Sequence, residues 1–158
     1  MTYYDQIAPG YNELHIEEQL QKLNFIAKYA KLEGNGLDVG CGTGISTGFF
    51  KCSVGIDPSE ELLKIAKNNY PKIRFIKANA EKLPFKDNEF DFVVSITAIQ
   101  NFDNIEKGLR EIKRVGKRFV LSFLKKSGRR DMIEKLIKSI FDVKKKIEEE
   151  KDIFYFCL

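Results

Sequence analysis

The amino-acid sequence predicts an α/β fold: a Rossmann-like, doubly wound, mostly parallel sheet of seven strands with helices on both faces and a C-terminal antiparallel hairpin. Short apolar runs alternate with segments of helical spacing through most of the chain, and such alternation joins parallel strands by right-handed crossovers. A glycine-rich turn follows the first apolar run, where an open α/β sheet carries its ligand site. The last two runs are close enough in sequence to pair with each other.

Each element is assigned from its apolar spacing and its flanking residues. Buried strands are expected at 37–39, 52–56, 73–76, 90–96 and 118–123. Helices are expected at 16–32, 44–50, 60–70, 104–115 and 129–141, the last four beginning at Thr43, Ser59, Asp103 and Ser127. The hairpin strands are expected at 143–149 and 153–158. The final run is apolar on both faces and its partner is mostly polar, so the last strand should lie inside and its partner at the edge.

The length of 158 residues corresponds to one domain that can bury a core without metal or disulfide staples. We expect residues 1–33 to form an N-terminal lid segment and a helix packed on a core made by residues 34–158. No apolar run approaches the ~20 residues of a membrane span, and the N-terminus lacks the layout of a signal peptide. The sequence therefore predicts a soluble, cytoplasmic protein with no membrane contact.

Charge and cysteine usage narrow the kinds of site that the chain can form. Lys and Arg number 27 and Asp and Glu 23, a net charge of +4 that neither requires nor excludes a nucleic-acid partner. The three cysteines, Cys41, Cys52 and Cys157, form no C-x-x-C pair, and His15 is the single histidine. Because they offer no set of zinc-ligand spacings, we predict no metal site and three buried free thiols.

The most informative segment is the glycine-rich turn that begins after Val39. Gly40, Gly42 and Gly44 lie between a strand and a helix, where bare backbone and free N–H groups can receive a nucleotide or a carboxylate. A dinucleotide fingerprint would need glycine in place of Ile45. A nicotinamide-dependent oxidoreductase is therefore disfavoured.

Two acids lie beside this turn. Asp38 precedes the first glycine, where a carboxylate would repel a pyrophosphate and attract a cationic ligand. Asp57 ends the second strand, from which a carboxylate can accept both hydroxyls of a ribose. Together they indicate a positively charged cofactor.

These segments resemble the class I S-adenosylmethionine-dependent methyltransferases, in particular the small type 11 family. The resemblance covers nearly the whole chain and rests on Asp38–Gly44, Gly55–Ser59, Ala78–Phe85 and Phe90–Ser95. It implies S-adenosylmethionine as cofactor and S-adenosylhomocysteine as product. The residues that it implies for cofactor binding are Asp38, Gly40, Cys41, Gly42, Gly44, Asp57, Pro58, Asn79, Ala80 and Ser95. Asn79 stands where the family usually carries Asp, and its carbonyl can still accept from the adenine amino group.

The methyl acceptor should lie beside residues 95–102 and the loop after Phe123, at the carboxyl ends of the strands. Segment 95–102 has neither the Asn-Pro-Pro-Tyr-like motif of amino-group methylases nor the paired cysteines of cytosine-carbon methylases. Many type 11 enzymes carry histidines where Gln100 and Asn101 stand here. The candidate catalytic residues are Tyr11, His15, Gln100 and Asn101.

Two further segments are expected to contact the acceptor. Tyr3 and Tyr4 belong to an aromatic N-terminal segment that resembles the lid of type 11 enzymes. Basic residues with no acidic neighbour before Asp131 would meet the phosphates of RNA: Lys125, Lys126, Arg129 and Arg130. The leading hypothesis is a methyltransferase with an RNA or partner-presented acceptor. A free small-molecule acceptor and a non-catalytic cofactor-binding subunit are the alternatives.

Overall fold

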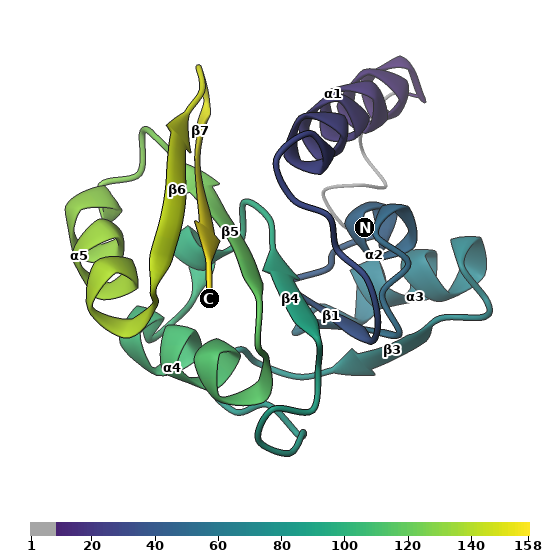
Figure 1. Ribbon diagram of the computed structural model, residues 1–158. Coiled ribbons are helices and arrows are strands. Elements are labelled where there is room, and N and C mark those ends of the chain that lie inside the picture. The colour runs from purple at the N-terminus through teal and green to yellow at the C-terminus, as the bar shows by residue number, and fades with distance from the viewer. Residues whose placement is uncertain (1–8) are drawn as a thin grey trace.

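The structure, a computed structural model, describes residues 9–158 and the side chains of residues 13–158. In this part of the chain, seven strands form one sheet in the order β3-β2-β1-β4-β5-β7-β6 (Figure 1). The strand bounds are β1 Gly36–Val39, β2 Val54–Asp57, β3 Arg74–Lys77, β4 Phe92–Ser95, β5 Phe119–Leu124, β6 Val143–Glu148 and β7 Asp152–Cys157. Each predicted strand is present with ends shifted by about two residues or fewer, and the predicted fold class is confirmed.

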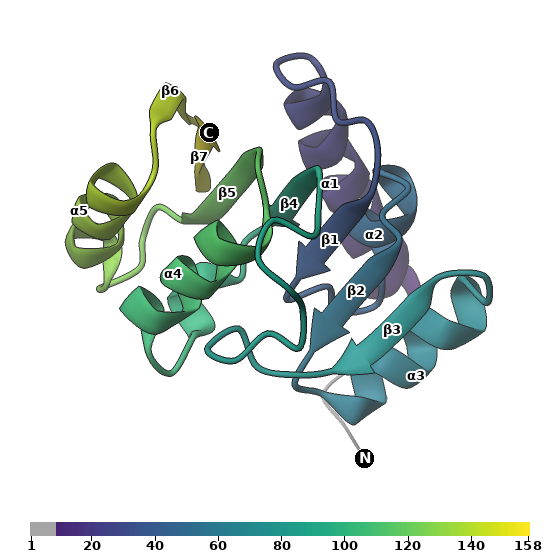
Figure 2. The same ribbon diagram turned by 60° about the horizontal axis from the view of Figure 1, so that its bottom comes forward.

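Helices lie on both faces of this sheet, with α4 and α5 on one face and α1, α2 and α3 on the other (Figure 2). The helix bounds are α1 Pro9–Ala27, α2 Ile45–Phe49, α3 Glu60–Asn69, the 3₁₀ turn η2 Ile99–Asn101, α4 Ile105–Val115 and α5 Arg130–Ile140. Leu109 of α4 and Ile137 of α5 are fully buried in the larger apolar core. Leu23 and Ile26 of α1 are fully buried in a second core on the opposite face. Each helix therefore packs its apolar stripe on the sheet.

The N-terminal helix differs from its prediction over 16–32, because it spans Pro9–Ala27. Proline is tolerated in a first helical turn, where an N–H has no partner in the helix. At the other end, the N–H of Lys28 donates to the carbonyl three residues earlier at 3.2 Å, a tightening that is common where helices end. The apolar spacing continues past this point because Ala30 and Leu32 pack on the core as loop residues.

One of the four predicted helix starts is confirmed and a second is wrong by one residue. The hydroxyl of Ser59 accepts from the N–H of Leu62 at 3.2 Å and caps α3, as predicted. For α4 the cap is Asn104 and not Asp103. Its side-chain oxygen accepts from the N–H of Lys107 at 3.0 Å.

The two remaining predicted helix starts are also wrong. The residue before α2 is Gly44, not Thr43, and it makes no side-chain cap. The residue before α5 is Arg129, and Ser127 instead accepts from the N–H of Arg129 at 3.1 Å through its hydroxyl. In both places the chain turns before the helix begins, and at α5 the hydroxyl of Ser127 stabilises this turn and not the first helical turn.

The C-terminal hairpin is present as predicted, with β7 between β5 and β6. All residues of β7 are buried, whereas β6 is largely exposed. A strand with neighbours on both sides and helices or loops on both faces needs apolar residues throughout, and an edge strand does not. The polar edge carries Lys144, Lys145 and Lys146.

Cys41, Cys52 and Cys157 are buried free thiols, as predicted. Burial raises the pKa of Cys157 to about 12, so its thiolate is disfavoured. Within residues 9–158 no helix combines the length and the apolar character that crossing a bilayer requires.

Candidate functional site

The carboxyl ends of β1, β2 and β4 meet at one edge of the sheet, where β1 continues into the glycine turn. Gly40 has a φ of 77°, and a Cβ at this position would lie 2.6 Å from the Cβ of Ala98. The N–H groups of Gly40 and Cys41 both donate to the carbonyl of Ile56 at 2.9 Å. Gly42 has a φ of 55°, and a Cβ there would meet nothing within 4 Å. The turn is therefore fixed on its inner side and open on its outer side.

A cleft of about 510 Å³ opens beside this turn. Residues predicted for the cofactor or for catalysis form much of its wall: His15, Gly40, Cys41, Gly42, Asp57, Pro58, Gln100 and Asn101. A smaller hollow of about 140 Å³ adjoins it and contains the predicted Asn79 and Ala80. Because the two spaces share Gly40, Pro58 and Asn101, an elongated ligand can occupy both.

Asp57 ends β2 in the wall of the cleft and is 8% exposed. Its Oδ2 accepts from the N–H of Gly42 at 3.0 Å, and its Oδ1 accepts from the N–H of Ser59 at 2.9 Å. Each carboxylate oxygen keeps a lone pair for a ligand hydroxyl. Asp57 thus also braces the glycine turn, a role that the sequence did not indicate.

A family signature covers the same region. The family model described as "Methyltransferase domain" matches residues 37–119. The chain belongs to this family. The resemblance to class I methyltransferases is therefore confirmed, and S-adenosylmethionine is the cofactor of this methyltransferase class.

Relatives and solved structures agree with this membership. The uncharacterized protein MJ1252 of Methanocaldococcus jannaschii is 39% identical over 115 residues, which are 72% of this chain and 45% of that protein. The demethylmenaquinone methyltransferase of Chlorobaculum tepidum is 35% identical over 127 residues, 71% of this chain and 52% of that protein. The crystal structure of PH0226 from Pyrococcus horikoshii shares the fold, with a TM-score of 0.86 over 99% of this chain and 98% of that chain at 21% identity. The chain spans about half the length of the curated relatives it matches.

In this methyltransferase domain Asp38 is fully buried beneath the glycine turn. Ser46 and Thr47, in α2, donate to its Oδ2 at 2.5 and 2.8 Å. Its Oδ1 has no hydrogen-bond partner among the described residues. Burial raises the pKa of Asp38 to about 6, although the two hydroxyls act in the opposite direction. An unpartnered buried acceptor beside an open glycine turn fits a cofactor that carries an ammonium group, so the residues present fit S-adenosylmethionine.

Two residues implied for cofactor binding lie behind the cleft and not in its wall. Ser95 is fully buried and donates to the carbonyl of Val39 at 2.9 Å, which ties β4 to β1. Gly44 is buried, and a Cβ there would come within 3.0 Å of the Phe75 ring. Both residues hold the turn in place from behind. Direct contact between either residue and the cofactor stays a prediction.

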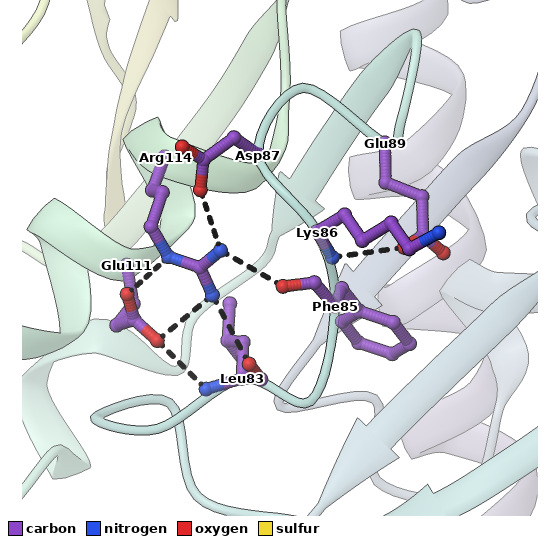
Figure 3. Close-up of polar contacts among 7 residues, drawn as sticks. All are labelled: Leu83, Phe85, Lys86, Asp87, Glu89, Glu111 and Arg114. Atoms are coloured by element: carbon purple, nitrogen blue, oxygen red, sulfur yellow. Dashed lines mark hydrogen bonds and ion pairs between the residues drawn. The ribbon is translucent and has the colours of Figure 1, made fainter.

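The segment between β3 and β4, which carries the residues of the smaller hollow, is held against α4 by Arg114 (Figure 3). The guanidinium donates to the carbonyls of Leu83 and Phe85 at 3.1 and 2.8 Å. It also bonds the carboxylates of Glu111 and Asp87 at 2.6 and 2.9 Å, and these bonds raise the pKa of Arg114. Sequence reasoning missed this residue, because most of its partners lie on a distant loop.

The basic residues after β5 have acidic neighbours, one on α5 and one on the distant strand β6. Lys125 and Arg130 lie 3.5 and 3.1 Å from Glu148, and Arg130 also lies 3.4 Å from Glu134. Lys126 is exposed. The cluster is therefore partly neutralised by acids that follow it in the chain, Glu134 of α5 and Glu148 of β6. Acceptor binding by these residues stays a prediction.

Arg129 donates hydrogen bonds to backbone groups in the wall of the cleft. Its guanidinium donates to the carbonyls of Gln100 and Phe102 at 3.2 and 2.7 Å. The start of α5 thereby fixes the η2 turn, which carries two of the predicted catalytic residues.

The N-terminal candidates are only in part within the described residues. Tyr3 and Tyr4 lie outside them, and Tyr11 is described only as backbone of α1. His15, also in α1, lies in the wall of the cleft as predicted. The N-terminal lid therefore stays a prediction.

Several wall residues were not among the candidate site residues. Thr97 lies in the segment 95–102 expected beside the acceptor but was not singled out, and outside that segment the wall also includes Gln19, Ser46 and Leu62. Thr97 has a φ of 54°, a left-handed conformation that a β-branched residue rarely adopts. No local pattern marks it, because its side-chain partners lie 55 and 75 residues away in the chain.

Proposed function

We propose that this chain transfers a methyl group from S-adenosylmethionine to a small aromatic acceptor. One observation carries the proposal: the cleft shares its wall with a second groove of about 770 Å³, lined by α1 and the β6–β7 turn. The shared wall consists of His15, Gln19, Thr97 and Leu124. A donor in the cleft and an acceptor in the groove would meet at this wall, where alignment and exclusion of water promote transfer.

The roles of the chain's residues follow from their positions. When bound, S-adenosylmethionine supplies a methyl group on a sulfonium sulfur, which leaves as the neutral thioether and keeps the electron pair of the broken carbon–sulfur bond. Asp57 accepts from the ribose and Asn79 from the adenine. Gln100 and Asn101 line the cleft and not the groove, so they act on the donor side. On the acceptor side, His15 lies in the wall shared by the cleft and the groove, where it can accept the acceptor's proton.

Charge favours a small acceptor over RNA. Acidic side chains outnumber basic ones in the groove, four to three: Glu18, Glu149, Glu150 and Asp152 against Lys22, Lys28 and Lys151. Such a wall does not attract a chain of phosphates. Three of the four basic residues predicted to contact RNA are also bonded to protein groups: Lys125, Arg129 and Arg130.

Two observations support an aromatic acceptor. Phe25 is partly exposed in the groove and is backed by the buried Phe154, with ring centroids 5.3 Å apart and planes tilted by 49°, so Phe25 offers an aromatic face on which a planar ring can pack. A relative that is 35% identical over most of this chain is named for methylation of demethylmenaquinone, which has a quinone ring.

Calorimetry followed by a methyl-transfer assay tests this proposal. We expect S-adenosylmethionine and S-adenosylhomocysteine to bind and NAD not to bind. Tritiated methyl groups should then enter the phenol and quinol fraction of a metabolite extract and not RNA. Label in RNA alone would overturn the small acceptor, and binding without any transfer would indicate a cofactor-binding subunit. Binding of neither cofactor form would overturn the whole proposal.

A further inference from the structure

Three polar side chains form a cluster where the groove meets the cleft: Lys22 of α1, Thr97 after β4 and Asp152 at the start of β7. The Nζ of Lys22 lies 2.7 Å from Oδ2 of Asp152 and donates to Oγ1 of Thr97 at 2.8 Å. Thr97 in turn donates to Oδ1 of Asp152 at 3.2 Å. The side chain of Lys22 is 17% exposed and that of Asp152 is 4% exposed. All three nevertheless line the groove, and Thr97 also lines the cleft.

The backbone holds Thr97 in a strained conformation to complete this cluster. With a φ of 54°, the residue is in a left-handed region that is unfavourable for a β-branched side chain. Its N–H donates to the carbonyl and the hydroxyl oxygen of Ser122 at 3.1 and 2.8 Å. Its own carbonyl accepts from Nε2 of Gln100 at 2.9 Å. These hydrogen bonds from β5 and η2 fix the direction of the Thr97 side chain. Glycine or asparagine would adopt this backbone conformation with less strain.

The cluster has unused hydrogen-bonding capacity on the groove side. The ammonium of Lys22 has three N–H groups and two are directed to Thr97 and Asp152. The carboxylate of Asp152 keeps further lone pairs. A ligand group that both accepts and donates would use the free N–H of Lys22 and a lone pair of Asp152. A hydroxyl is the smallest such group.

We infer that Lys22, Thr97 and Asp152 bind the hydroxyl group of a planar aromatic acceptor, such as a phenol or a hydroquinone, whose ring lies against Phe25. The hydroxyl oxygen accepts from the ammonium of Lys22, and its proton is donated toward Asp152. The inference rests on the proposed function, because that function places a methyl donor in the adjoining cleft. It concerns binding of the acceptor and can therefore be tested without turnover.

A pair of matched probes tests this site on the whole chain. The ¹⁵N-labelled protein, saturated with S-adenosylhomocysteine, is titrated with 2-naphthol and separately with 2-methoxynaphthalene, which has the same ring but no O–H donor. The amide signals of Lys22, Thr97 and Asp152 should move with 2-naphthol. 2-Naphthol should bind about tenfold more tightly than 2-methoxynaphthalene, because it makes one additional buried hydrogen bond.

Three variants separate this role from a structural one. Thr97→Val and Lys22→Met should both remove the preference for 2-naphthol. Lys22→Met, which lies outside the cleft, should also leave affinity for S-adenosylhomocysteine within about twofold of the wild type. Thr97→Ser keeps the hydroxyl and should keep the preference. Lys144→Met, on the exposed edge strand, removes a lysine outside the groove and serves as the control.

The outcomes are distinct. Equal affinity of the wild type for the two probes, or no binding of 2-naphthol, would overturn the inference whether or not the variants fold. If the folded Thr97→Val and Lys22→Met variants keep the preference for 2-naphthol, the cluster only holds α1 on β7. This result would also overturn the inference. The proposed function would fail separately, through loss of cofactor binding in the wild type.

Discussion

The glycine turn at the centre of the sheet and the β6–β7 hairpin at its edge hold buried charge in opposite ways. Under the turn, Asp38 is fully buried, and burial raises its pKa to about 6. Beside the hairpin, partial burial would also raise the pKa of Glu134, but hydrogen bonds from Lys146 and Tyr155 lower it to about 2. The Nζ of Lys146 lies 2.7 Å and the hydroxyl of Tyr155 2.8 Å from its Oε1.

The difference separates a region arranged for binding from one arranged for stability. At the turn, the backbone of Gly40 and Gly42 is in the left-handed region, and one oxygen of Asp38 has no hydrogen-bond partner among the described residues. An unpartnered buried oxygen stays unfavourable until a ligand donates to it. Around Glu134 the donors are already in place. We therefore expect substitutions at the turn to change ligand affinity and substitutions beside the hairpin to change unfolding.

The largest expected effect is that of Gly40→Ala. The new Cβ would be both in a left-handed conformation and 2.6 Å from the Cβ of Ala98, so the turn must move. We expect the dissociation constant for S-adenosylmethionine to rise on the order of a hundredfold. Gly128→Ala is the matched control, because a Cβ there meets nothing within 4 Å. Equal calorimetric affinity of the two variants would mean that the turn does not bind the cofactor.

Asp57→Asn should have the next largest effect. The amide retains one acceptor oxygen where the carboxylate has two, so an N–H donor must face the N–H of Gly42 or that of Ser59. Loss of charge-assisted bonds of about 1.5–3 kcal/mol corresponds to a rise of roughly tenfold to a hundredfold in the dissociation constant. Asp131→Asn on exposed α5 should leave the affinity unchanged. If the two variants bind alike, Asp57 does not contact the ribose.

Affinity for S-adenosylmethionine should also fall as the pH decreases through about 6. Below the raised pKa of Asp38, the free protein holds a neutral carboxylic acid, and this proton must leave before an ammonium can pair with the carboxylate. The dissociation constant should rise by up to about tenfold per pH unit below the pKa and level off above it. Asp38→Asn should bind weakly with a flat profile. An equally steep profile in this variant would assign the titration to another group.

Glu134→Gln should have the smallest effect, and on unfolding alone. The folded pKa lies below the ordinary value of 4.5, so the carboxylate contributes stability above about 4.5 and loses it as the pH falls toward 2. We expect the free energy of unfolding in urea to decrease by about 1 kcal/mol at neutral pH. The wild type and the variant should converge in acid, and their cofactor affinities should be equal. A difference that persists in acid would mean that packing and not charge is lost.

Much of the fold follows from local patterns. The strands, the parallel order and the inner position of β7 could be predicted because burial on both faces leaves unbroken apolar runs, and the polar run of β6 indicates an edge. The ends of α1 could not be predicted, because the apolar spacing continues through the loop residues Ala30 and Leu32, which also pack on the core. Asp103 failed as a helix cap because the neighbouring Asn104 adopts the extended backbone geometry of a cap. Thr43 failed because the left-handed Gly44 stands between it and α2.

By itself, the sequence determined the sheet, the glycine turn and the positions of Asp38 and Asp57, because these depend on contiguous residues and on the common direction of parallel strands. Only the tertiary structure decided that Asp57 braces Gly42, that Glu148 pairs with basic residues after β5, and that Lys22 meets Asp152. The physical reason is that a charge or a hydroxyl is satisfied by whatever lies within about 3 Å of it, and which distant element comes that close is set by the packing of the whole fold.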